Sequence, residues 1–109
     1  MQTARTVSGS LRGLAPLGAK ASEAVRYLKL LGNEHRLLIL CNLATAGEMT
    51  VNDLADEVGL GQSALSQHLA RLRADGLVGF RREAQTLFYR VSDRKALRML
   101  TALKGIFCP

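Results

Sequence analysis

The sequence predicts a mainly α-helical fold with one small β hairpin. Apolar residues recur at intervals of three and four along most of the chain, whereas two short segments between Leu77 and Val91 alternate apolar and polar residues. The composition is 48% hydrophobic but only 5% aromatic, which favours helices packed through Leu, Ala and Val. The 109 residues suffice for one modest core, so a partner subunit would add buried surface.

Residues 1–18 are expected to form a flexible N-terminal arm, and residues 19–109 one folded domain. The arm contains glycines and a proline that disfavour a stable helix: Gly9, Gly13, Pro16 and Gly18. It has basic residues and no acid, which would also fit an organelle transit peptide. From Ala21 the apolar residues follow helical spacing until Gly32, which predicts a first helix over roughly 19–32.

The next two helices are predicted from their capping residues. Asn33 can cap a second helix that ends before Gly47, and its apolar stripe puts Cys41 on the inward face. Thr50 and Asp53 have the spacing of a capping box, which predicts a third helix over Val51–Val58, closed by a glycine.

A fourth helix should begin near Gln62, after a tight Leu60-Gly61 link. It buries leucines at helical spacing: Leu65, Leu69 and Leu72. Two short helices joined by a glycine turn are typical of a helix-turn-helix. The alternating segments Leu77–Arg82 and Thr86–Val91 predict a hairpin, a wing behind that pair, joined around residues 83–85. Ser92 can cap a last helix that runs toward the C-terminus.

The charge of the chain favours nucleic acid as a partner. Fifteen Lys and Arg against nine acids give a formal net charge of +6, and eleven of the fifteen are Arg. Arginine is the residue better suited to contacts with phosphates and bases. A basic domain without a nucleic-acid partner is the alternative on charge alone.

The fourth helix has a polar face opposite Leu65. A glutamine such as Gln67 can contact adenine through two hydrogen bonds, and a small residue such as Ala70 allows close approach to a groove. Arg82 and its neighbours on the hairpin can reach phosphates or the minor groove, although a solvated basic strand would look the same. We interpret His68 as a packing residue. The predicted DNA contacts are Gln62, Ser63, Ser66, Gln67, Ala70, Arg71, Arg81, Arg82 and Gln85, with Arg90 as a further basic residue of the wing.

Three segments carry a resemblance to a known family: Leu31–Leu40, Leu65–Leu69 and Asp75–Val78. Through them, the chain from Leu28 to Pro109 resembles the ArsR family of winged-helix repressors. The resemblance implies four helices, two strands and a fifth helix, in that order. It also implies a homodimer through the first and last helices that binds palindromic operator DNA and blocks transcription. A two-fold dimer would present two reading helices one DNA turn apart.

Members of this family commonly sense metals, through cysteine pairs on the third helix or Asp and His ligands on the last. This sequence departs from both patterns, because its third helix has no cysteine and its last helix offers Asp93 but no histidine. Only two histidines exist, His35 and His68, so a four-ligand zinc site within one subunit is hard to assemble. No metal or cofactor is predicted, although a metal-sensing repressor stays an alternative.

Cys41 and Cys108, with their neighbours, look like the persulfide-sensing branch of the family, the BigR and SqrR type. That resemblance implies that the reduced dimer binds DNA and that sulfane sulfur species join the two thiols through a polysulfide bridge, which releases the operator. A peroxide-responsive repressor with a simple disulfide and a constitutive architectural DNA-binding protein are the alternatives. Cysteine is also often a small buried apolar residue.

Two further classes of protein are disfavoured. No apolar run approaches the roughly 20 residues that span a bilayer, and the N-terminus lacks a continuous apolar signal core, so we expect a cytoplasmic protein. An enzyme is not expected, because no nucleophile stands with a base and an orienting acid and no glycine loop is of the phosphate-binding kind.

Overall fold

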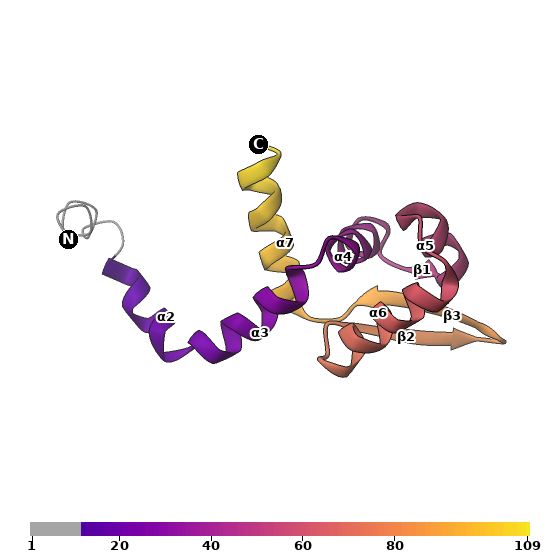
Figure 1. Ribbon diagram of the computed structural model, residues 1–109, viewed down its shortest axis with the longest axis horizontal. Helices are drawn as coiled ribbons and strands as arrows, with labels where there is room; N and C mark the ends of the chain where they lie inside the picture. Colours follow the sequence, from indigo (N-terminus) through magenta and orange to yellow (C-terminus); the bar gives the residue numbers. More distant parts are fainter. Residues whose placement is uncertain (1–11) are drawn as a thin grey trace.

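The computed structural model describes residues 12–109 (Figure 1). This part of the chain contains six α-helices and a three-stranded antiparallel sheet, so the predicted helix-rich winged helix-turn-helix is confirmed. The elements are a short 3-10 helix η1 (Arg12–Leu14), α2 (Ala15–Ala19), α3 (Ala21–Leu31), α4 (Glu34–Ala46), β1 (Met49–Thr50), α5 (Val51–Val58), α6 (Gln62–Ala74), β2 (Val78–Glu83), β3 (Thr86–Val91) and α7 (Arg94–Phe107).

Helical structure begins earlier than the sequence indicated. We expected an arm without stable helix over residues 1–18, but η1 and α2 are helical, while residues 1–11 lie outside the described part. Pro16 occupies the first turn of α2, where a backbone N–H has no partner within the helix and its loss costs nothing. Lys20 separates α2 from α3, so the predicted helix over 19–32 becomes Ala21–Leu31.

Two predicted caps form as expected. The side-chain oxygen of Asn33 accepts a hydrogen bond from the backbone N–H of Arg36 at 3.0 Å, which fixes the start of α4. The hydroxyl of Thr50 accepts from the backbone N–H of Asp53 at 3.2 Å, at the start of α5. Gly59 follows α5 with φ 71°, in the left-handed region where glycine is favoured. The predicted bounds Val51–Val58 are therefore confirmed.

The sheet has one more strand than the sequence indicated. Its strand order is β1-β3-β2. In the wing, β2 pairs with β3, and the register runs from Val78 opposite Val91 to Glu83 opposite Thr86. The first wing strand was expected over Leu77–Arg82 but begins and ends one residue later. Strand β1 has only two residues, too few for an alternation of apolar and polar side chains to be visible, and it joins the sheet by pairing Met49 with Tyr89.

Helix α7 is capped by a different residue than predicted. Asp93, not Ser92, accepts the backbone N–H of Ala96, at 3.1 Å. The carboxylate of Asp93 directly precedes the first helical residue, whereas the hydroxyl of Ser92 donates to the carbonyl oxygen of Gly76 at 3.3 Å. Ser92 therefore ties the end of the wing to the turn that follows α6.

The core lies between α4, α5, α6 and the base of the wing and consists mainly of leucine. Among the described residues no polar or charged residue is fully buried. The largest side chains without exposed surface are Leu30, Ile39, Leu40, Leu43, Leu54, Leu65, Leu69, Leu72 and Leu77. Aliphatic packing of this kind holds the helix-turn-helix rigid against the wing.

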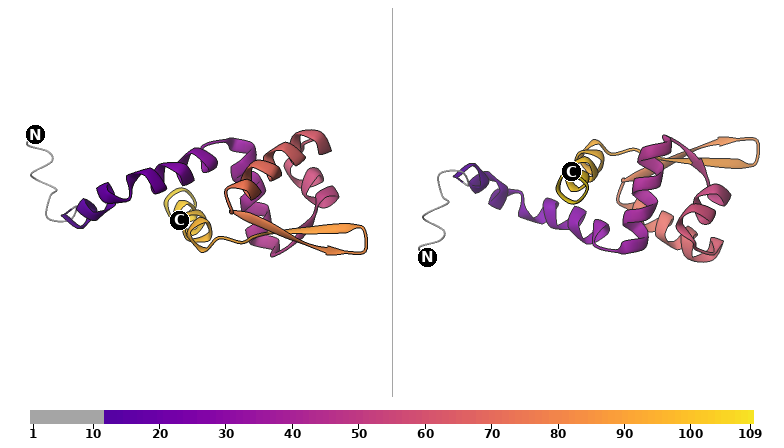
Figure 2. Two further views of the ribbon diagram at one scale, coloured as in Figure 1. Left: turned by 90° about the horizontal axis from the view of Figure 1, so that it is seen from below. Right: turned by 90° about the horizontal axis from the view of Figure 1, so that it is seen from above.

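The chain is elongated. Its radius of gyration is 16.8 Å, whereas a compact domain of this length has about 13 Å. Figure 2 shows α2 and α3 extending away from the core on the side opposite the wing. Large apolar side chains are exposed on η1, α2, α3 and α7: Leu14, Leu17, Val25, Leu28, Leu97, Ile106 and Phe107. None of the described helices is long and apolar enough to cross a membrane.

Candidate DNA interface and dithiol groove

Helix α6 presents the polar face that the sequence predicted. Leu65, Leu69 and Leu72 are buried in the core. The residues predicted to read DNA lie on the remaining surface of the helix and are exposed: Ser63, Ser66, Gln67, Ala70 and Arg71. The wing lies beside α6 (Figure 1), so a duplex that contacts α6 can also meet β2 and β3.

Gln62 has a partner within the protein. Its side-chain amide donates to the side-chain oxygen of Asn52 in α5. This hydrogen bond joins the two helices of the helix-turn-helix at the start of α6. Gln62 thus helps to position the reading helix.

Arg81 is the predicted wing contact with the most partners in the protein. Its Nε lies 2.9 Å from Oε2 of Glu48 and its Nη1 2.7 Å from Oε2 of Glu83, and its guanidinium stacks over the ring of Phe88. Hydrogen bonding to Glu48, and then to Glu83, raises the pKa of Arg81 further above its usual range. Two carboxylates neutralise the charge of Arg81. No local pattern indicated Glu48 as a partner, because that residue is 33 positions away.

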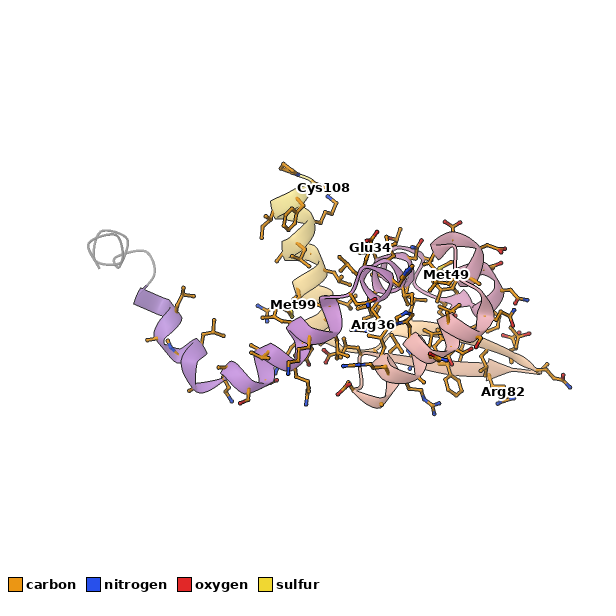
Figure 3. All side chains as sticks on the ribbon, in the orientation of Figure 1. Glu34, Arg36, Met49, Arg82, Met99 and Cys108 are labelled. Atoms are coloured by element: carbon orange, nitrogen blue, oxygen red, sulfur yellow. The ribbon has the colours of Figure 1, made fainter. Side chains whose placement is uncertain are left out.

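The other wing residues remain available. Arg82, Gln85 and Arg90 are exposed, and Arg82 lies on β2 near the hairpin end (Figure 3). Arg73 of α6, which the sequence did not single out, stacks its guanidinium over the ring of Phe80 at 4.4 Å. This contact fixes the wing against the reading helix.

His68 packs, as interpreted from the sequence. It is half-buried, and its ring stacks with that of His35 with centroids 5.9 Å apart. Burial, followed by the nearby charge of Arg36, lowers the pKa of His68. The pair therefore joins α4 to α6 with His68 neutral at neutral pH.

Cys41 and Cys108 line one groove between α4 and α7, with a volume of about 520 Å³. The other lining residues are mainly apolar: Leu37, Ala44, Thr45, Leu100, Thr101, Leu103, Lys104 and Phe107. Both thiols are free and exposed. The expectation that Cys41 faces inward is therefore wrong, because Ile39, Leu40 and Leu43 occupy the core side of α4.

The groove is unfavourable for negative charge at Cys41. Burial, and then the neighbouring Cys108, raises the pKa of the Cys41 thiol. Cys108 follows the last turn of α7, where its backbone N–H donates to the carbonyl oxygen of Lys104 at 2.7 Å (Figure 3). The backbone of Cys108 is thus held at the end of the helix.

Comparison with known proteins shows what kind of molecule carries these surfaces. The family described as "Bacterial regulatory protein, arsR family" matches residues 33–79. The transcriptional activator HlyU of Vibrio cholerae is 43% identical over 102 residues, which cover 94% of each chain. The chain belongs to the arsR family. The prediction of a transcriptional regulator, and not an enzyme, is thereby confirmed.

Two solved structures of this kind are similar along their length. The arsR-family chain matches the transcriptional repressor BigR from Xylella fastidiosa with a TM-score of 0.80 and 38% identity, covering 86% of this chain and 95% of that one. It matches a winged helix-turn-helix DNA-binding domain from Mycobacterium bovis, described as homodimeric, with a TM-score of 0.71 and 30% identity over 84% of both chains.

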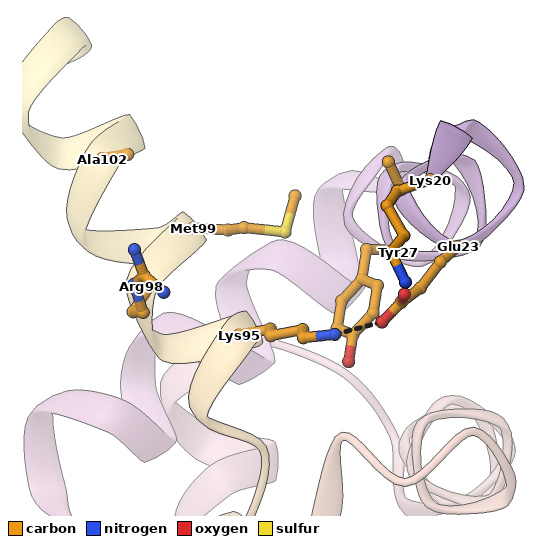
Figure 4. Close-up of a pocket in the computed structure, with 8 residues that line it drawn as sticks. Lys20, Glu23, Tyr27, Lys95, Arg98, Met99 and Ala102 are labelled. Carbon is orange, nitrogen blue, oxygen red and sulfur yellow. Dashed lines mark hydrogen bonds and ion pairs between the residues drawn. The ribbon is translucent and has the colours of Figure 1, made fainter. Parts of the chain in front are cut away.

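A second hollow of this arsR protein lies between α3 and α7 (Figure 4). Lys95 of α7 forms an ion pair with Glu23 of α3 there, and this contact lowers the pKa of Glu23. Lys20, Tyr27 and Met99 lie around the pair. Across residues 12–109, no cluster of three or more His, Cys, Asp or Glu side chains could hold a metal ion.

Proposed function

We propose that this arsR protein is a homodimeric repressor that binds palindromic operator DNA while Cys41 and Cys108 are reduced, and that leaves the operator when sulfane sulfur joins the two thiols. The observation that carries the proposal is that both thiols line one groove, although they are far apart in sequence. Two cysteines in a reducing compartment seldom form a structural disulfide, which favours a redox role for this pair.

The surface of α6 and the wing supports the DNA-binding part. Gln67 and Ala70 offer base contacts, while Arg71 and Arg82 offer phosphate contacts. A protein that occupies a promoter in this way blocks transcription by excluding polymerase. BigR is described as a repressor and HlyU as an activator, and occupancy alone favours the repressor.

The exposed apolar residues support the homodimer. Leu14, Leu17 and Leu28 on the projecting helices, and Phe107 on α7, expose surface that a second copy would bury. The Mycobacterium bovis relative is described as homodimeric. Two copies related by a two-fold axis would bring both α6 helices to a palindromic site.

The chemistry needs only the two thiols and a sulfur donor, written R–S–SH. Each cysteine thiolate attacks the terminal sulfur of one donor, which gives a cysteine persulfide, Cys–S–SH, and releases R–SH. The two persulfides then condense to Cys41–S–S–S–Cys108 and release H₂S. The donor sulfur is the oxidant, so no further electron acceptor is required.

A bridge across the groove would couple the thiols to the reading helix. Helix α4 contacts α5, α6 and α7, so a covalent tie between α4 and the end of α7 would act on the element that supports α6. Allosteric coupling is typically about 1 to 3 kcal/mol, or roughly 5- to 150-fold in affinity. A change of that size empties an operator that is half occupied.

The test treats reduced protein with a sulfane sulfur donor and combines intact mass with operator binding. We expect added sulfur between Cys41 and Cys108 and weaker binding, and neither effect in Cys41→Ser or Cys108→Ser protein. A plain disulfide formed by peroxide alone would favour the peroxide-responsive alternative. Unchanged DNA binding with both thiols modified would contradict the switch.

A further inference from the structure

We propose that the groove between α4 and α7 selects small anionic hydropolysulfides, such as HS–S⁻, and that Lys104 is the residue that determines this selectivity. The inference rests on the proposed function and names the class of sulfur donor. Lys104 is the one charged residue among those that line the groove. It is exposed, and within residues 12–109 it forms no ion pair.

The other polar side chains of the groove leave this cation as the dominant attraction for an anion. The hydroxyl of Thr101 donates to the carbonyl oxygen of Leu97 at 3.0 Å, so its proton is already used. Leu37, Leu100 and Phe107 have no polar side-chain atom, and Thr45 offers only a neutral hydroxyl. The groove thus combines apolar walls with a single positive charge.

The charges balance for a monoanionic donor. Because the pKa of Cys41 is raised, its thiol is largely protonated at neutral pH, and a neutral thiol with HS–S⁻ has one net negative charge. The thiol proton passes to HS–S⁻, the thiolate so formed attacks one sulfur of HS–SH, and HS⁻ leaves. The exchange Cys–SH + HS–S⁻ → Cys–S–SH + HS⁻ thus keeps a single negative charge throughout. One lysine therefore matches reactants and products.

A persulfide borne by a peptide fits this groove less well. Glutathione persulfide has two carboxylates and an ammonium group besides its sulfur atoms. Each of these groups would lose water on entering the groove, and a single lysine cannot pair with all of them. The inorganic donor has no such groups.

The first arm of the test measures the charge preference of Cys41 without any sulfur chemistry. In Cys108→Ser protein, Cys41 is the single thiol, and its alkylation by iodoacetate is compared with that by neutral iodoacetamide. Lys104→Gln should lower the ratio of the two rates roughly threefold to tenfold. Lys104→Arg should retain the ratio, as should the matched control Lys29→Gln on α3, outside the groove.

The second arm measures sulfur transfer to the wild-type chain from sodium hydropolysulfide and from glutathione persulfide. Hydropolysulfide should react faster, and Lys104→Gln should remove most of that advantage. If the bridge forms at the same rates in wild-type and Lys104→Gln protein, or if the alkylation ratio is unchanged, this inference is overturned while the proposed function stands. If wild-type protein adds no sulfur from either donor, the proposed function itself fails and the donor assignment fails with it.

Discussion

The Nε of Arg36 in α4 donates a hydrogen bond at 2.9 Å to the backbone carbonyl oxygen of Leu30 in α3. Its Nη2 donates to the carbonyl oxygen of Lys29 at 3.1 Å, so that one guanidinium satisfies two carbonyls at the end of α3. The same α4 segment begins with the Asn33 cap. Arg36 therefore fixes the angle at which the projecting helix leaves the core.

Replacement of Arg36 should destabilise the fold. Arg36→Ala removes hydrogen bonds from a charged, half-buried donor and leaves two carbonyls unpaired, which should lower the free energy of unfolding by about 1 to 3 kcal/mol. Urea denaturation of the variant measures the loss. Arg98→Ala, at an exposed position, serves as the matched control and should change stability by less than about 0.5 kcal/mol. Equal stability of the two variants would contradict a structural role for Arg36.

Release of Arg81 from Glu48 should strengthen binding to any DNA sequence. Glu48→Gln removes the carboxylate that pairs with Nε of Arg81, so that this edge of the guanidinium can donate to a phosphate while Nη1 stays paired with Glu83. The slope of the logarithm of the binding constant against the logarithm of the salt concentration should then become steeper by about 0.9. Glu57→Gln, an exposed position on α5, is the control for the change in net charge. The same slope for both variants would show that Arg81 does not reach the backbone of the duplex.

Gln67 and Arg82 should have separable roles in DNA binding. Gln67→Ala should weaken operator binding by about 1 to 3 kcal/mol and relax sequence preference, because a base contact is lost. Arg82→Ala should weaken operator and random DNA alike and flatten the salt dependence. Titration of both variants against the two DNAs at several salt concentrations separates these effects. A loss from Gln67→Ala that is equal on operator and random DNA would mean that Gln67 does not read bases.

His68 should make the protein less stable in mild acid. The folded state lowers the pKa of His68 below the ordinary value of 6.5, so the unfolded chain binds this proton more readily. Stability contributed by the neutral ring is present above that value and is lost as the pH falls through the shifted pKa. The midpoint of urea unfolding should therefore drop as the pH falls through and below 6.5, the ordinary pKa of the unfolded chain.

The matched variant for this pH effect is His68→Gln, which should lose part of the drop. Lys95 lowers the pKa of Glu23, so the stability that the Glu23 carboxylate contributes is lost only as the pH falls below 4.5, the ordinary pKa of this group. Glu23 therefore does not account for a loss of stability near the pKa of histidine. An identical pH dependence in His68→Gln and wild-type protein would contradict the assignment.

Alkylation of Cys41 should require higher pH than alkylation of an ordinary thiol. Its pKa is raised by burial and by Cys108, so thiolate forms later as the pH rises. Cys108→Ser removes the second cause and should move the rate profile part of the way back. Mass spectrometry of iodoacetamide-treated protein at several pH values measures the profile. An unshifted profile in Cys108→Ser protein would show that the two sulfur atoms do not influence each other.

Local signals predicted much of the fold because they act over a few residues. The bounds of α5 follow from Thr50, Asp53 and Gly59, whose capping interactions are complete within the segment. Contacts between distant residues had no such signal. The pairing of Met49 with Tyr89 and that of Arg81 with Glu48 depend on how the wing returns to the core.

The orientation of Cys41 illustrates the limit of periodicity. Helix α4 is apolar on nearly every side, from Leu37 and Leu38 through Cys41 to Ala44, so its core face could not be identified from spacing alone. Packing against α5 and α6 put Ile39 and Leu43 inside. The expectation that Cys41 and Cys108 act together therefore came from the resemblance to a known family, and not from the spacing of residues in the sequence.

The outward reach of α2 and α3 also bears on gene dosage. Leu14 and Leu17 are exposed in a monomer, and in the proposed mechanism dimerisation precedes tight operator binding. At low abundance the number of dimers grows with the square of the number of chains. Promoter occupancy would then follow synthesis of this regulator more steeply than in direct proportion. A modest rise in expression would close the promoter sharply.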